Sequence, residues 1–141
     1  MNTDFLDAHE RHWDDAELLK AQLRHANADH LYGMSAECGL KCLMIQFGMS
    51  MSIRPDGTGI PGDQKDVVHA NKIWNRFESY RSGHHQGARY ILTSTNPFMD
   101  WDVNQRYASK SDFDETRVES HRQGTERVRE LIAMAQRDGL I

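Results

Sequence analysis

The segment from residue 28 to residue 48 constrains the fold most, because it is apolar on two sides of a helix. It reads ADHLYGMSAECGLKCLMIQFG. On a helical wheel Leu31 and Cys42 lie on one flank, and Leu40 and Phe47 lie on the other. A helix with two apolar flanks must be covered by a neighbour on each side. The segment therefore predicts a central helix, over residues 29–47, in an all-α bundle.

One narrow stripe of this helix is charged, with Glu37 and Lys41 four residues apart. Ser35 and Gly39 lie on the opposite side, and their small size lets a neighbouring helix approach closely. Two interpretations of the charges are open. An exposed ion pair at this spacing adds only about 0.2–0.5 kcal/mol to helix stability. A partly buried pair would instead line a groove, where each charge could bond a neighbouring helix or a ligand.

Apolar residues at helical spacing predict three more main helices. The first covers residues 4–27, the second begins near Asp63 and ends near residue 81, and the last runs from about residue 112 to residue 137. Asp29 is a suitable N-cap for the central helix, and Gly48 is a suitable end. The fold class predicted is an up-and-down helical bundle of four main helices, with residues 1–141 forming a single domain.

The connections carry further expectations. Residues 49–62 contain two Pro and three Gly after Arg54, which predicts a loop, longer than most and therefore mobile or functional. Residues 88–95 are ambiguous between a short helix and an extended piece. Pro97, after Asn96, predicts the start of a short fifth helix. No strand pair is predicted anywhere in the chain.

The charge balance excludes one way of binding nucleic acid. The formal net charge is -4 and the pI about 6.0, so the chain has no general basic field for a phosphate backbone. A nucleic-acid contact would need a local basic patch. No apolar run is long enough to cross a membrane, and no signal peptide is visible. We therefore expect a cytoplasmic protein without a membrane partner.

The cysteines and histidines do not predict a metal site or another cofactor. Cys38 and Cys42 are the two cysteines, and we expect buried, reduced side chains, with a reactive thiol as the alternative. His9 and His12 share the inner stripe of the first helix, and residues 84 and 85 are adjacent histidines. None of these spacings follows an established zinc motif, so buried, hydrogen-bonded histidines are expected. Motifs for a serine nucleophile, a P-loop or a dinucleotide site are also missing.

The stretch 28–48 resembles the second helix of HEPN domains (higher eukaryotes and prokaryotes nucleotide-binding). That helix has a small-rich run with an acid, then Leu-Lys, then aliphatics, as at Glu37, Leu40 and Lys41. The pattern from residue 69 to residue 77 is similar to the third helix of the family. The stretch NPFMDWDVNQRY, residues 96–107, is similar to the short helix that leads to an Arg-Tyr pair in many such domains.

The resemblance implies a helical bundle that is often a homodimer. Some members of the family are metal-independent ribonucleases of toxin–antitoxin or other defence systems. Others bind nucleotides without catalysis and are encoded beside a nucleotidyltransferase, which would then be a partner. We expect a domain that binds a nucleotide, an RNA-like ligand or a partner protein without strong catalysis. A ribonuclease and a pure protein-interaction module are the alternatives.

The ribonucleases of the family carry an Arg, four to six residues, and then a His. Arg81 and His85 come nearest in position and are the candidate catalytic pair, although only three residues separate them. Arg117 and His121 have the same short spacing on the last helix. An Arg would stabilise the developing phosphorane charge, and a His would move a proton.

Four residues are candidate ligand contacts: Glu37, Lys41, Arg106 and Tyr107. Arg106 could bind a phosphate through two parallel hydrogen bonds, and Tyr107 could stack on a base. The alternative is structural, with Tyr107 in the core and Arg106 paired with an acid such as Asp102.

Overall fold

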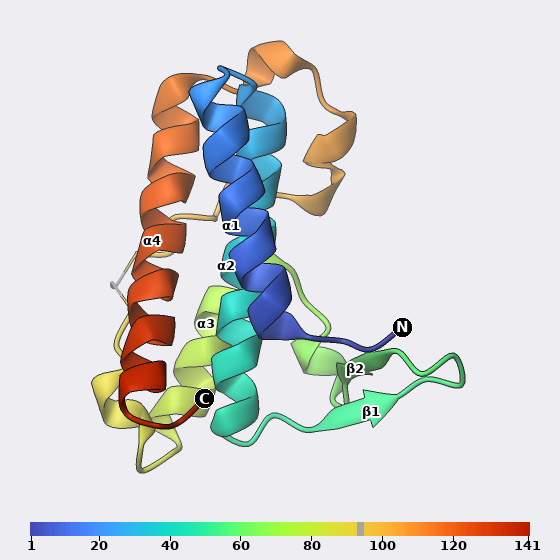
Figure 1. Ribbon diagram of the computed structural model, residues 1–141, viewed down its shortest axis with the longest axis vertical. Coiled ribbons are helices and arrows are strands. Elements are labelled where there is room, and N and C mark those ends of the chain that lie inside the picture. The colour runs from blue at the N-terminus through green and yellow to red at the C-terminus, as the bar shows by residue number, and fades with distance from the viewer. Residues whose placement is uncertain (93–94) are drawn as a thin grey trace.

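Four α-helices dominate the computed structural model, which describes residues 1–92 and 95–141 (Figure 1). The second helix lies against each of the other three, as expected for a helix with two apolar flanks. The prediction of an all-α bundle with four main helices is confirmed. Within the described residues, none of the helices has the length and hydropathy that crossing a bilayer requires. The helices are α1 (Phe5–Ala21), α2 (His25–Gln46), α3 (Ala70–Ser82) and α4 (Glu115–Arg137).

Small side chains on α2 allow α1 and α4 to approach closely, as the sequence predicted. A Cβ atom on Gly39 would lie 2.6 Å from Cγ1 of Val128 and 2.7 Å from Nδ1 of His9. Ser35, one turn earlier, donates a hydrogen bond from its hydroxyl to the His9 carbonyl at 2.8 Å. Since a larger residue would push these helices apart, this side of α2 fixes their spacing.

The junction of α1 and α2 differs from the prediction. α1 ends at Ala21 rather than at residue 27, and a turn with a positive φ of 58° at Leu23 separates the two helices. α2 then begins at His25, so Asp29 lies inside the helix and is fully buried. The assignment of Asp29 as an N-cap was therefore wrong, because a buried acid and a capping acid look alike in sequence.

Residues 49–62 are not a simple loop, and the expectation of no strand pair was wrong. β1 (Met51–Ile53) and β2 (Gly59–Pro61) form an antiparallel pair. Thr3 donates a hydrogen bond from its hydroxyl to the Gly59 carbonyl at 2.7 Å, which ties the N-terminal residues to β2. Each strand has three residues, too few for an alternating pattern to be recognised.

α3 begins at Ala70, seven residues later than predicted. The preceding residues form a short 3-10 helix, η1 (Gln64–Asp66), capped by Asp63. The fully buried Asp66 holds η1 against α3, because its carboxylate accepts hydrogen bonds from Arg76 Nε at 2.8 Å and from the Tyr80 hydroxyl at 2.6 Å. The buried carboxylate, rather than an apolar repeat, decides the path of the chain here.

The segment between α3 and α4 contains 3-10 helices rather than the predicted α-helical turn. Residues 97–100 form a turn, so a short helix opening at Pro97 was wrong. Residues 93 and 94, in the ambiguous stretch, lie outside the described residues. α4 begins slightly later than expected, after its cap Asp114. The 3-10 helices are η2 (Gly87–Arg89), η3 (Val103–Tyr107) and η4 (Lys110–Asp112).

Both cysteines are free and buried, as expected. Burial raises the pKa of the Cys38 thiol to about 12 and that of Cys42 to about 11. Both side chains therefore stay protonated at neutral pH and act as small apolar residues of the core.

Trp101 attaches the segment before η3 to α2. The indole is 1% exposed and donates a hydrogen bond from Nε1 to the Asp29 carbonyl at 3.2 Å. It lies directly on Gly33, where an added Cβ atom would overlap the indole ring. The absence of a side chain at residue 33 is therefore a condition for this docking.

We expect Gly33→Ala to lower the free energy of unfolding by about 1–3 kcal/mol, because the new methyl group must displace a buried indole. Gly83→Ala is the control, since a Cβ atom there meets its nearest neighbour at an ordinary 3.4 Å. The control should change stability by less than about 0.5 kcal/mol. Urea denaturation of both variants measures the difference, and equal stability losses would contradict this account of Gly33.

Candidate functional site

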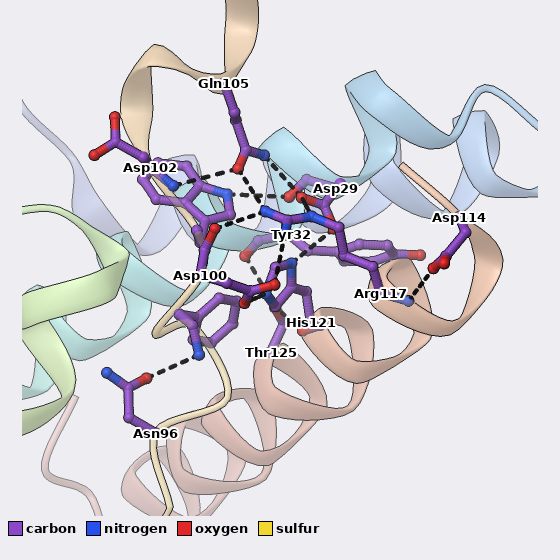
Figure 2. Close-up of polar contacts among 12 residues, drawn as sticks. Asp29, Tyr32, Asn96, Asp100, Asp102, Gln105, Asp114, Arg117, His121 and Thr125 are labelled. Carbon is purple, nitrogen blue, oxygen red and sulfur yellow. Dashed lines mark hydrogen bonds and ion pairs between the residues drawn. The ribbon is translucent and has the colours of Figure 1, made fainter. Parts of the chain in front are cut away.

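A fully buried carboxylate, Asp29, is the centre of a polar cluster that joins α2, α4 and η3 (Figure 2). Its Oδ1 lies 2.6 Å from Nδ1 of His121. Its Oδ2 accepts hydrogen bonds from Gln105 Nε2 at 2.8 Å and from Arg117 Nε at 3.3 Å. Because an unpaired buried carboxylate is costly, these three donors fix how the segments meet.

Asp100 closes the solvent side of the same cluster. Its carboxylate lies 3.0 Å from His121 Nε2 and 2.5 Å from Arg117 Nη1, and its side chain is 61% exposed. Desolvation would raise the pKa of Asp100, but the hydrogen bond from His121 and the nearby positive charges lower it below its usual value. Since carboxylates face both ring nitrogens of His121, both contacts are hydrogen bonds only when the imidazole is protonated.

A second polar cluster surrounds the charged stripe of α2. Lys41 Nζ donates a hydrogen bond to Glu37 Oε1 at 2.6 Å, and the two residues are only 6% and 7% exposed. His69 Nδ1 lies 3.1 Å from the other oxygen of Glu37. Burial acts to raise the pKa of Glu37, but the hydrogen bond from His69 and the charge of Lys41 lower it. The hydrogen bond to Glu37 raises the pKa of His69.

The burial of Glu37 and Lys41 that the second interpretation expected is therefore confirmed, whereas the groove that it expected stays a prediction. Neither residue lines the surface hollows described below. The pair holds η1 and the start of α3 near α2 through His69, and whether it also contacts a ligand stays a prediction.

Two histidines, His30 and His69, contact Trp101 between the two clusters. The ring of His30 stacks on Trp101 with a centroid distance of 5.4 Å and an angle of 18° between the planes. His69 lies on the same indole at 6.5 Å. His9 and His12 are the histidines of α1, and burial lowers the pKa of His9 to about 4. Among the described residues, no group of three His, Cys, Asp or Glu side chains could hold a metal ion.

The candidate ligand residues Arg106 and Tyr107 lie on the surface of η3. Tyr107 is 76% exposed, so the alternative that placed it in the core was wrong. The guanidinium of Arg106 lies 4.7 Å from the centre of that ring. In the described part of the chain, no carboxylate is within ion-pair distance of Arg106, so the proposed pairing with Asp102 is not formed.

The candidate catalytic residues lie elsewhere. Arg81 forms an ion pair with Glu78 at 2.6 Å. His85 stacks on His84 and lines a hollow together with the residues that follow α4; Arg81 does not line this hollow. Residues 82–90 lie at one end of the long axis, and η3 and η4 lie towards the other end (Figure 1). The six candidate residues therefore do not line one groove.

Two adjoining hollows lie where the turn between α1 and α2 meets η3 and η4. One has a volume of about 590 Å³ and the other about 410 Å³, and both are bordered by Asn27 and Lys110. In the described residues, no carboxylate is within ion-pair distance of the cationic residues that line them. We call this surface the cationic end and define it by Arg24, His25, His30, Arg106 and Lys110.

The start of α2 adds to the positive potential of the cationic end. The cap residue Arg24 offers no side-chain acceptor to the first N–H groups of the helix, and the first turn contains no acidic residue. The partial positive charge of a helix N-terminus is therefore uncompensated beside the larger hollow.

Sequence reasoning missed the roles of several residues. Asp29 was assigned as a cap, and Asp100 received no assignment. Arg117 and His121 were noticed only for their spacing. The available signal was a pair of polar residues, 117 and 121, one helical turn apart beside the apolar residues of α4. Comparison of the chain with protein-family models, with curated proteins and with solved structures finds no match.

We expect Glu37→Ala to lower the free energy of unfolding by about 3–5 kcal/mol, because it leaves the buried ammonium of Lys41 without a partner. Glu78→Ala is the matched control, since it breaks the more exposed ion pair with Arg81 and should cost about 0–1 kcal/mol. Chemical denaturation of both variants measures the difference. A loss below about 1 kcal/mol for Glu37→Ala would show that Lys41 does not depend on this carboxylate.

Proposed function

We propose that the chain is an HEPN-like domain that binds a phosphate-bearing ligand, a nucleotide or single-stranded RNA, without strong catalysis. One observation carries the proposal: cationic side chains with no carboxylate partner line two adjoining hollows. The resemblance of residues 28–48 to the second HEPN helix points to the same class of ligand. A homodimer and a nucleotidyltransferase partner are further implications of that resemblance, and the hollows themselves are formed by one chain.

The negative net charge of the chain makes the cationic end the expected place for an anionic ligand. A chain with a net charge of -4 repels a polyanion on average, so binding depends on local positive potential. Arg24, Arg106 and Lys110 supply that potential from two segments that are far apart in sequence. Volumes of this size are typical of small-molecule sites.

The exposed Tyr107 supports a nucleotide rather than a simple anion. An aromatic ring on the surface offers a face for stacking by a base, which contributes about 1–3 kcal/mol per base in single-strand binding proteins. The guanidinium of Arg106 lies over this ring and beside the smaller hollow, so it could contact a phosphate attached to the stacked nucleoside.

We expect Arg106→Ala/Lys110→Ala to weaken binding of a labelled single-stranded RNA roughly tenfold or more, because two charged hydrogen-bond donors are lost. The control, Arg54→Ala/Lys65→Ala, changes the net charge equally near the β hairpin and should bind like the parent. Fluorescence anisotropy over a range of salt concentrations gives a second readout. The slope of the logarithm of the binding constant against the logarithm of the salt concentration should become about 1.4 less steep for the first variant only.

Two outcomes would overturn the proposal. One is equal weakening by both double variants, which would mean unspecific charge attraction. The other is the absence of any binding to RNA, together with no rise in melting temperature at millimolar concentrations of a nucleotide panel. The second outcome would favour the protein-interaction module.

Metal-independent RNA cleavage is the second candidate function, favoured by one observation. α4 brings an Arg and a His, Arg117 and His121, onto the same carboxylate of Asp100. His121 is only 1% exposed and both of its nitrogens face carboxylates, so Asp100 would have to move before the ring could exchange a proton with RNA. The pair Arg81 and His85 stays a prediction, with Arg81 engaged by Glu78.

If the chain is a ribonuclease, purified protein should cleave RNA in the presence of EDTA. His85→Ala should abolish cleavage if the pair at residues 81 and 85 is catalytic, and His121→Ala should do so if the pair on α4 is catalytic. Circular dichroism of each variant checks that the fold is retained. RNA that stays intact after long incubation with the parent protein would exclude this candidate.

A further inference from the structure

His30 is the residue of the cationic end whose hydrogen bonding is incomplete. Its Nδ1 is buried and has no hydrogen-bond partner among the described residues. The ring is held by stacking on Trp101 and by its place in the second turn of α2. It also borders the smaller hollow, together with Arg106 and Lys110. The ring therefore borders the hollow with one nitrogen whose hydrogen bonding is not satisfied by the described residues.

The charges that face His30 come from several elements. From α2, Asp29 and Glu37 favour a positive ring, whereas Arg106 from η3 and His69 from before α3 oppose it. His12 of α1 also faces it. Burial is the largest effect and lowers the pKa of His30, and the charge of Arg106 lowers it further. Burial and the charge of Arg106 therefore favour the neutral ring in the free protein.

We propose that binding of a phosphodiester in the smaller hollow takes up one proton at His30, so that the site binds more tightly as the pH falls. This inference rests on the proposed function, because it requires the ligand to occupy that hollow. A phosphate between His30, Arg106 and Lys110 would compensate the positive charge that now opposes protonation. The protonated ring would also gain a cation–π contact with the indole of Trp101 on which it already stacks.

The direction of the pH effect follows from linkage. A bound anion raises the pKa of His30 in the complex above its lowered value in the free protein. The added affinity is therefore fully present below the pKa of the free protein and is lost as the pH rises through the pKa of the complex. An opposite charge at close range shifts a pKa by about 1–3 units, so the gain is roughly tenfold or more.

The test measures binding of a fluorescent 2′-O-methyl oligouridylate without terminal phosphates between about pH 5 and 8. Its phosphodiesters and bases do not titrate in that range, whereas a terminal phosphate would. It also lacks the 2′-hydroxyl that cleavage requires. We expect the affinity of the parent protein to rise roughly tenfold or more towards low pH. His30→Gln should bind with a nearly flat profile, and His85→Gln, at the far end of the molecule, should keep the full profile.

A second measurement does not depend on a variant that could perturb the stack on Trp101. NMR titration of the histidine ring signals of the parent protein, with the His30 signal assigned by its absence in His30→Gln, should show its midpoint rising when the oligonucleotide is added. An unchanged midpoint of the His30 titration would overturn the inference. It would also be overturned if the affinity of His25→Gln were independent of pH while that of His30→Gln still rose towards low pH. Binding that is independent of pH would overturn it while leaving the proposed function intact. No binding at any pH would overturn both.

Discussion

The structure depends on the burial of one carboxylate, Asp29, near the start of α2. The free-energy cost of removing this charge from water is offset only when His121, Gln105 and Arg117 all reach it. These donors come from α4, whose Val118 belongs to the same apolar cluster as Ala28 and Tyr32 of α2, and from η3. Hydrophobic contact brings these elements close to α2, and the hydrogen bonds to the carboxylate fix which residues face one another.

Trp101 links this interaction to the rest of the molecule. One edge of the indole donates to the carbonyl of Asp29, and its face carries His30. The buried Glu37 lies further along α2 and reaches the indole only through His69. The two polar clusters are thus separated by one aromatic side chain, which needs a glycine at residue 33 to fit.

The sequence predicts the parts of this fold that depend on apolar and small residues at helical spacing. The two apolar flanks of α2 and the small residues Ser35 and Gly39 were sufficient to place a central helix with close neighbours. The pairs with long sequence separation could not be predicted in this way. The sequence does not show whether an aspartate such as Asp29 caps a helix or is buried within one. In the same way, it does not show that Asp66 is buried in a short 3-10 helix and that α3 begins only after it. The partners of the Asp29 carboxylate lie 76 to 92 residues along the chain, and those of the Asp66 carboxylate lie 10 and 14 residues along.

The candidate site could also be predicted only in part, because some of its residues come from segments that are far apart in sequence. Arg106 and Tyr107 were recognised from the stretch that they end; both are on the surface, and Arg106 lines a hollow. Arg24 and Lys110 were not recognised, because nothing local shows that the turn before α2 meets η4. Arg81 and His85 were chosen by their position in the sequence, and position does not show that Glu78 already holds the guanidinium.

The sequence separations within the Asp29 cluster have a consequence for how the chain reaches its final state. α1 and α2 are joined by a short turn and can pair early, whereas the contact from Asp29 to His121 closes a span of 92 residues. Closing such a span costs chain entropy before any contact compensates for it. The hollows exist only after η3 and η4 have docked on α2. A ligand that occupies them therefore binds the completed fold alone and slows its local opening, which hydrogen exchange at the start of α2 would report.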